Sequence, residues 1–174
     1  MDDRPRVRRL EAEDAASFIS LRREALDADP LAFAASVEDD FALDPDFVRR
    51  SLANEHEQAV FGYFEAEQLR GIVGLVRASK LKQRHAATVW GMYVSASARR
   101  RGAGRALLDA AVAQARAWGV EQVQLAVSDA APQAKRMYQA AGFKSWGHQP
   151  RTLGWQGRFV DEDHMVLELG EPGG

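Results

Sequence analysis

A cluster of arginine and glycine residues stands immediately before an amphipathic segment of the chain. The stretch SASARRRGAGRALLDAAV, residues 95–112, places four arginines beside two glycines where a helix must begin. The first amides of a helix have no partner within it, and the helix dipole adds positive charge at the same end. Further positive charge at this point indicates a bound anion, and arginine suits the paired oxygens of a phosphate.

Two glycines, Gly102 and Gly104, open the backbone at this turn because neither carries a side chain that would keep a ligand away. An apolar run at residues 87–94 predicts a strand, and the apolar spacing of residues 103–118 predicts a helix. The turn between them contains four arginines: Arg99, Arg100, Arg101 and Arg105. Free helix amides, fixed positive charge and small residues together predict a turn that binds a diphosphate.

Two common phosphate-binding motifs fit this turn poorly. A P-loop requires lysine and then serine or threonine after its second glycine, whereas Arg105 and Ala106 follow here. The dinucleotide motif requires a third small residue where the chain has Leu107. A nucleotide-dependent oxidoreductase is therefore the weaker interpretation of the turn.

The surrounding chain alternates between predicted strands and predicted helices. Strands are predicted at residues 4–10, 58–66, 69–79, 87–94, 120–127, 143–147 and 158–169, and helices at residues 14–28, 44–54, 103–118 and 132–141. The order β-α-α-β-β-β-α-β-α-β-β predicts an α/β fold, with a mixed, mostly antiparallel sheet, one parallel crossover and helices on both faces. Because no repeat or long linker interrupts this order, we expect residues 1–174 to form one domain with flexible tails at about residues 1–4 and 170–174.

The composition excludes several classes of function. The chain has 28% charged residues and a formal net charge of −2, so no overall positive field attracts nucleic acid. No cysteine is present, which excludes disulfides and thiolate catalysis. The histidines show no ligand spacing and no apolar run is long enough to span a membrane, so we expect neither a metal nor a membrane partner. We expect a cytoplasmic protein that is a monomer or a homodimer.

Residues 87–143 resemble a known protein family. Arg99, Gly102 and Gly104 match the turn R/Q-x-x-G-x-G/A that binds acyl-coenzyme A, and V-x-x-x-x-RRRGAGRALL looks like motif A of the GNAT superfamily of N-acetyltransferases. The block AKRMYQAAGF at residues 134–143 is similar to that family's A-x-x-L-Y-x-x-x-G-F. The resemblance implies a GNAT-like fold and an enzyme that uses acetyl-CoA as its co-substrate and needs no metal.

The resemblance also implies roles for individual residues. The backbone of Met92, Tyr93 and Val94 is expected to pair with the pantetheine arm of the coenzyme, and the Val94 amide to stabilise the oxyanion that forms when an amine attacks the thioester. The pyrophosphate is expected to bind the amides of Arg100, Arg101, Gly102, Ala103, Gly104 and Arg105. Tyr138 is expected to protonate the leaving thiolate, because a hydroxyl with a pKa of about 10 keeps its proton at neutral pH.

The acceptor is less well defined by the sequence. The segment DPLAFAAS, residues 29–36, resembles an element of one GNAT subgroup, which implies that Phe33 and Ser36 line the acceptor groove. Small amines, antibiotics, amino acids and protein N-termini all remain open as acceptors. Ala131 stands where family members often have asparagine, so we expect one contact to the coenzyme to be lost.

No general base is identified by the sequence. Glu38, Glu65 and Asp163 are candidates to relay a proton through water, and bulk solvent is an alternative to all three.

Other interpretations of these residues stay open. Tyr138 also fits a core aromatic on an amphipathic helix, and residues 99–101 also fit a solvated charge run. Trp146 and Trp155 flank a predicted loop at residues 147–157, where they either cover a substrate or pack in the core. A non-catalytic module that senses acyl-CoA or regulates a partner is the alternative function.

Overall fold

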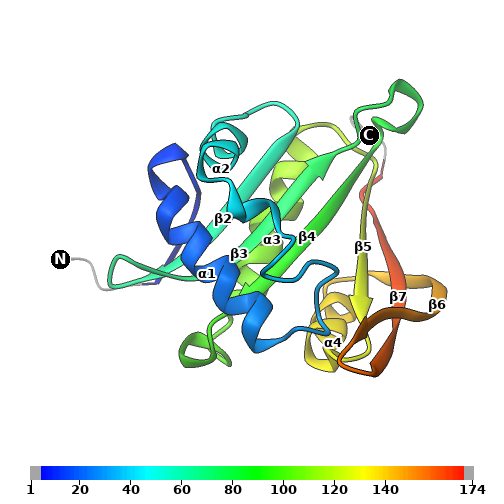
Figure 1. The fold of residues 1–174 in the computed structure, drawn as a ribbon. Helices are drawn as coiled ribbons and strands as arrows, with labels where there is room; N and C mark the ends of the chain where they lie inside the picture. Colours follow the sequence, from blue (N-terminus) through cyan, green and yellow to red (C-terminus); the bar gives the residue numbers. More distant parts are fainter. Residues whose placement is uncertain (1–4, 171–174) are drawn as a thin grey trace.

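The computed structural model describes residues 5–170, whose seven strands form one sheet in the order β1-β2-β3-β4-β5-β7-β6 (Figure 1). The strands are β1 (Arg6–Arg9), β2 (Gln58–Glu65), β3 (Gln68–Arg77), β4 (Ala86–Val94), β5 (Gln122–Ser128), β6 (Lys144–Trp155) and β7 (Arg158–Glu168). The α-helices are α1 (Ala15–Ala28), α2 (Pro45–Leu52), α3 (Ala103–Ala117) and α4 (Pro132–Ala140). The tails expected at residues 1–4 and 170–174 lie outside the described residues, except for Gly170. Within residues 5–170, no helix combines the length and the apolar character that crossing a membrane requires.

Strands β4 and β5 form the one parallel pair of the described sheet, and all other neighbouring strands are antiparallel. The parallel pairing joins residues 86–88 of β4 to residues 122–124 of β5 and then stops. Beyond it β4 continues beside β3 to Val94, and β5 continues beside β7 to Ser128. The two strands therefore diverge, and the sheet opens between their C-terminal ends. The mixed, mostly antiparallel sheet expected from the sequence is confirmed.

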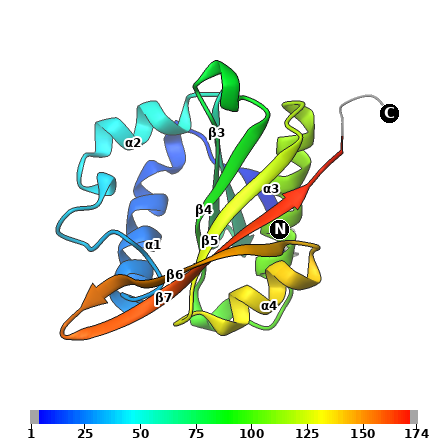
Figure 2. The same cartoon turned by 90° about the vertical axis from the view of Figure 1, so that its right-hand side faces the viewer.

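Helices cover both faces of the sheet, as the element order predicts. Figure 2 views the sheet nearly edge-on, with α1 and α2 on one side and α3 on the other. Side chains alternate between the two faces along a strand, so Ile72 packs with α1 and α2 while its neighbour Val73 packs against α3. Both side chains are fully buried, and each contributes about 2 kcal/mol by leaving water.

Local sequence accounts for the buried face of α3 and for the start of α2. Leu107, Leu108, Ala111 and Ala115 have no exposed surface, and their spacing places them on one side of α3. The Asp44 side chain accepts hydrogen bonds from the first free amides of α2 and so fixes the start of this helix, at the position that the sequence predicts.

The C-terminal hairpin differs from its prediction. The sequence predicts a short strand that ends at Gly147 and then a loop, but β6 runs on to Trp155 and forms a long hairpin with β7. Pro150 is tolerated because β6 is an edge strand that pairs on one side only, and because residues 150–152 bulge out of the register with β7. The surface of Trp146 is 65% exposed, so this residue does not pack in the core.

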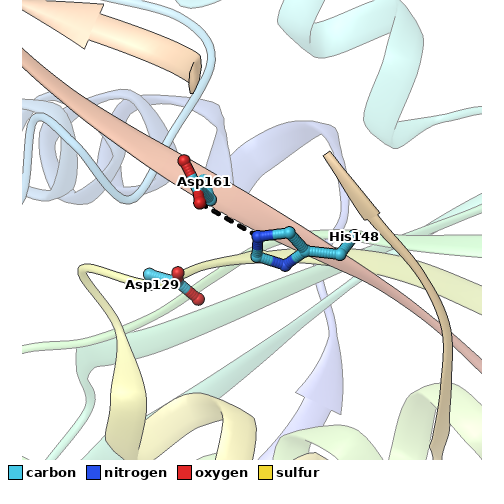
Figure 3. A group of neighbouring side chains, drawn as sticks. All are labelled: Asp129, His148 and Asp161. Carbon is cyan, nitrogen blue, oxygen red and sulfur yellow. Dashed lines mark hydrogen bonds and ion pairs between the residues drawn. The ribbon is translucent and has the colours of Figure 1, made fainter. Parts of the chain in front are cut away.

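His148 ties this hairpin together. Its Nδ1 lies 2.7 Å from a carboxylate oxygen of Asp163 and its Nε2 lies 2.9 Å from Asp161, the contact drawn in Figure 3. Asp163 also pairs with Lys135 of α4, and Asp161 accepts the amide of Arg151 in the bulge. The hydrogen bonds to Asp163 and Asp161 raise the pKa of His148 above its ordinary value, which favours an imidazolium between the two carboxylates.

A buried ion pair fixes the long connection between α1 and α2. Arg22 of α1 donates from Nη2 to Asp40 at 2.9 Å, and both side chains are almost completely buried. The Arg22 guanidinium also lies over the rings of Phe33 and Phe41. The pair therefore anchors the far end of residues 29–40, the loop that borders the sheet opening.

Removing the negative charge of this pair is expected to destabilise the fold. Asp40→Asn leaves the Arg22 guanidinium buried without a counter-ion and should lower the free energy of unfolding by about 3 kcal/mol. The matched control is Asp46→Asn, which breaks the exposed Asp46–Arg49 pair and should cost less than about 1 kcal/mol. Urea unfolding of both variants measures the difference, and equal losses would contradict the anchoring role.

The hairpin is expected to respond to pH through His148. Because its pKa is raised in the folded state, its contribution to stability is fully present below the unfolded pKa of about 6.5 and is lost as pH rises through the folded pKa. NMR titration of the ring should give a pKa above 6.5. Asp163→Asn should lower that value, whereas Glu168→Gln, which removes the same charge elsewhere on β7, should not. A ring that titrates at its ordinary pKa would refute the ion-pair network.

Candidate functional site

A pocket of about 570 Å³ occupies the opening between β4 and β5. Residues predicted from the sequence that line it are Phe33, Met92, Tyr93, Val94, Arg99, Arg100, Ala103, Gly104 and Ala131. Lining residues that sequence reasoning did not single out are Asp29, Ala32, Ala98, Ala130, Pro132, Gln133, Ala134 and Met137. The pocket thus joins the end of β4, the start of α3, the β5–α4 connection and the loop after α1.

The turn before α3 carries backbone amides without partners. The first helical hydrogen bond runs from the amide of Ala106 to the carbonyl of Gly102, so the amides of residues 103–105 stay free within the described chain. Gly102 adopts a φ of 80° and Arg100 a φ of 65°, both in the left-handed region that few side chains tolerate. Left-handed residues in such a turn bring successive amides to one side, and this geometry binds anions.

The arginines of the turn have distinct positions. Arg99 donates to the Val94 carbonyl at 2.9 Å and to Asp29 at 3.0 Å, so it joins β4 to the end of α1. Arg101 pairs with Glu65, and Arg105 with Asp109 one helical turn later. Arg100 lines the pocket and has no ion pair within residues 5–170. The structure thus distinguishes Arg100 as the cation of the cluster that is both at the pocket and unpaired.

Gly104 allows α3 and α4 to approach one another at the pocket wall. A Cβ atom at this position would lie 3.0 Å from the Met137 sulfur and 3.9 Å from a methyl of Val94. A Cβ at Gly102 would meet nothing within 4 Å, so that glycine is required by its backbone angle alone. Met137 is a residue that sequence reasoning missed, because its contact with α3 depends on how the two helices pack.

The free edge of β4 faces the pocket. The amide of Ser95 donates to the Arg70 carbonyl at 2.8 Å, so the Ser95 backbone faces β3. Because backbone groups alternate between the two edges of a strand, those of Val94 face the opening instead. The β4 ladder to β5 has already ended at this point, so the Val94 amide is available to a ligand.

The Tyr93 side chain has a structural function. It is buried and its hydroxyl donates to Glu24 of α1 at 3.0 Å, while the Ser95 hydroxyl donates to the same carboxylate at 2.8 Å. Burial and then the hydrogen bond to Glu24 raise the pKa of Tyr93 to about 12. Tyr93 therefore stays neutral and holds α1 against the end of β4.

Tyr138 lies in the core beside the pocket and is not among the lining residues. Its ring packs edge-on against Phe143, with 5.8 Å between centroids, and only 5% of its surface is exposed. Burial raises the pKa of its hydroxyl well above the ordinary value, so the proton is retained at neutral pH. Every buried side-chain oxygen within residues 5–170 has a hydrogen-bond partner. The Tyr138 hydroxyl has no partner in that range, so its oxygen must reach solvent-accessible surface.

The loop after α1 bridges the opening and borders a second pocket. The Ser128 hydroxyl at the end of β5 donates to the Leu31 carbonyl at 2.6 Å and fixes the loop to that strand. Phe33 lines both pockets, whereas Ser36 lines only the second one and hydrogen-bonds to Asp39. The two residues expected at the acceptor groove are thus neighbours along one loop but stand at different distances from the α3 turn.

The carboxylates considered as bases occupy separate surroundings. Glu65 pairs with Arg101, Asp163 lies between His148 and Lys135, and Glu38 is exposed at the second pocket. None of the three lines the first pocket.

A small cluster of metal-ligand types stands at the β6–β7 hairpin. Asp129, His148 and Asp161 place donor atoms within 4.8 Å of one another (Figure 3). Both ring nitrogens of His148 already contact carboxylates, so the cluster behaves as an ion-pair network in this conformation.

Comparison with known proteins agrees with this geometry. The profile of the Acetyltransferase (GNAT) family matches residues 18–143, a stretch that includes most of α1, the α3 turn and Tyr138. Comparison with curated proteins finds no matching sequence.

Solved structures share the fold over nearly the whole chain. A GNAT-family acetyltransferase from Streptococcus pneumoniae superposes with a TM-score of 0.83 at 23% identity, covering 95% of this chain and 100% of its own. A phosphinothricin acetyltransferase from Sinorhizobium meliloti, solved with acetyl-CoA, also gives 0.83 at 23% identity, covering 97% and 90%. A ribosomal-protein-alanine N-acetyltransferase from Brucella melitensis gives 0.78 at 18% identity, covering 94% and 99%. The opened sheet, the amide-rich turn and the match over residues 18–143 lead to one conclusion: the chain belongs to the GNAT family of acetyltransferases.

Proposed function

We propose that this acetyltransferase transfers the acetyl group of acetyl-CoA to a primary amine of a small molecule or a peptide. The observation that carries the proposal is the pocket between β4 and β5, which combines a free strand edge at Val94 with free amides at the start of α3. Backbone donors at these two places suit an amide-containing arm and a pyrophosphate, respectively.

The residues present fit the coenzyme. The free amides of residues 103–105 and the Arg100 guanidinium supply positive charge for the phosphates, and Gly104 in the pocket wall has no side chain to keep them away. Ala131 offers no polar side chain at the β5–α4 connection, so the backbone carries more of the binding there.

The chemistry follows from the positions of the chain's own groups. Acetyl-CoA supplies an activated thioester. The Val94 amide, directed into the opening, stabilises the negative charge that develops on the carbonyl oxygen as the amine attacks. Tyr138 retains its proton because it is buried, and its role is to donate that proton to the departing sulfur. The amine attacks in its neutral form, and the proton that its nitrogen loses passes to bulk solvent, from which Tyr138 is reprotonated.

An assay of free thiol tests the proposed function directly. Acetyl-CoA is incubated with the protein and a broad panel of primary amines, and thiol release is followed with and without each amine. Amine-dependent release, with the acetylated amine identified by mass spectrometry, is expected. Tight coenzyme binding without transfer to any amine would instead support the non-catalytic binding module.

A charge placed in the α3 turn is expected to abolish coenzyme binding. Gly104→Glu puts a carboxylate among amides that bind phosphates, and repulsion should weaken acetyl-CoA affinity by roughly 100-fold or more. Gly104→Ala is the matched control, because its Cβ presses closely only on the flexible end of Met137, makes an ordinary contact with Val94 and should cost far less. Calorimetric titration measures both affinities, and circular dichroism checks the fold. Undiminished affinity in a folded Gly104→Glu protein would overturn the assignment.

Loss of the Tyr138 hydroxyl is expected to slow the reaction without weakening coenzyme binding. Tyr138→Phe keeps the ring packed against Phe143 but removes the proton donor, so kcat should fall by roughly 100-fold while the Kd for acetyl-CoA stays within about two-fold. Steady-state kinetics and titration measure the two quantities. An unchanged kcat would leave Tyr138 a purely structural residue.

A further inference from the structure

The second pocket adjoins the coenzyme pocket, with Phe33 as a shared wall. It has a volume of about 290 Å³ and lies between the loop after α1 and the outer part of β6. Leu31, Leu153 and Trp155 give it apolar walls. Residues 152–155 of β6 line its far side. Figure 2 shows the β6–β7 hairpin, to which they belong, extending past the end of α1. The pocket has room for a group of the size of a large amino-acid side chain, held next to the site of transfer.

The charged side chains that line this second pocket are all acidic: Asp27, Glu38 and Asp39. Asp39 accepts hydrogen bonds from the amide and hydroxyl of Ser36, which lower its pKa and keep it ionised at neutral pH. Asp27 and Glu38 make no ion pair within residues 5–170. No lysine or arginine is among the described lining residues, so the pocket has a negative potential.

Neighbouring cations are committed to other contacts. Arg22 lies beneath the loop in its buried pair with Asp40, and Arg99 pairs with Asp29 on the side of the coenzyme pocket. The Arg151 guanidinium lies 3.8 Å from the centre of the Phe159 ring on the hairpin. Arg23, four residues before Asp27 on α1, lines a neighbouring pocket and not this one. Within residues 5–170 none of the three carboxylates of the second pocket forms an ion pair.

We propose that this second pocket holds the acceptor and selects an amine whose far end carries a positive charge next to an apolar segment. This inference rests on the proposed transfer to an amine. Apolar walls favour a hydrocarbon segment, and carboxylates at the rim attract a cation and repel an anion. Phosphinothricin, an amino acid that ends in an anionic phosphinate, should therefore be a poor acceptor here, although a phosphinothricin acetyltransferase shares the fold.

Three amines of different charge test the selection. Agmatine carries a guanidinium opposite its primary amine, tyramine a neutral phenol, and phosphinothricin an anionic group. The expected order of kcat/KM is agmatine, tyramine, phosphinothricin, with roughly ten-fold or more between the first and the last. The preference for agmatine should shrink as salt rises, because the carboxylates are exposed to solvent. Equal or better use of phosphinothricin would overturn the proposal.

Variants that neutralise one carboxylate of the second pocket test whether these side chains cause the selection for a cationic acceptor. Asp27→Asn should raise KM for agmatine by roughly five-fold, with kcat unchanged and KM for tyramine unaffected. Glu38→Gln should raise KM for agmatine to a similar extent. Glu55→Gln is the matched control: it removes the same net charge close to β2, at the end of the sheet away from Val94, and should change nothing. Equal changes in KM for agmatine and for tyramine would show that the carboxylates do not distinguish acceptors by their charge.

Binding separates failure of this inference from failure of the proposed function. Agmatine and phosphinothricin are titrated calorimetrically into the protein saturated with coenzyme A, so no transfer is required. Tighter binding of agmatine, weakened in Glu38→Gln, supports the pocket even if no amine is acetylated. Tighter binding of phosphinothricin refutes it even if acetyl transfer to other amines is observed.

Discussion

The separation of β4 from β5 is the constraint on which the rest of the site depends. Their pairing stops at residue 88 of β4, so the last residues of that strand have one edge without a strand partner among residues 5–170. Buried backbone groups must find partners, and Arg99 supplies one for the Val94 carbonyl. A site made mainly of backbone depends little on side-chain identity.

Polar contacts hold the opening at its present width. Glu24 of α1 accepts hydrogen bonds from Tyr93 and Ser95 at the end of β4, whereas Leu31, just beyond the helix, accepts one from Ser128 of β5. One segment of chain is therefore bonded to both of the strands that diverge. The pockets proposed for the coenzyme and for the acceptor meet at Phe33 on this same segment, so the element that braces the opening also shapes the proposed acceptor site.

The sequence predicts those parts of the structure that depend on local pattern. Helix α3 follows from the spacing of Leu107, Leu108 and Ala111, and its turn from the arginines and glycines before it. The distribution of the arginines is not local: Arg99 meets Asp29 from 70 residues away, which no pattern in the chain reveals. The length of β6 is missed for the same reason. Proline and glycine in residues 147–157 favour a loop, and only the register with β7 shows that they lie on an edge strand.

The two edges of the sheet also determine how the protein behaves at high concentration. An exposed strand edge offers unpaired amides and carbonyls to another molecule and can seed aggregation. Here β1 is only four residues long. Strand β6 is longer, but Pro150 removes one donor and the bulge around Arg151 breaks the straight row of backbone groups. Pro150 and the bulge of β6, which the sequence suggests as a loop, therefore also reduce aggregation through this edge of the sheet.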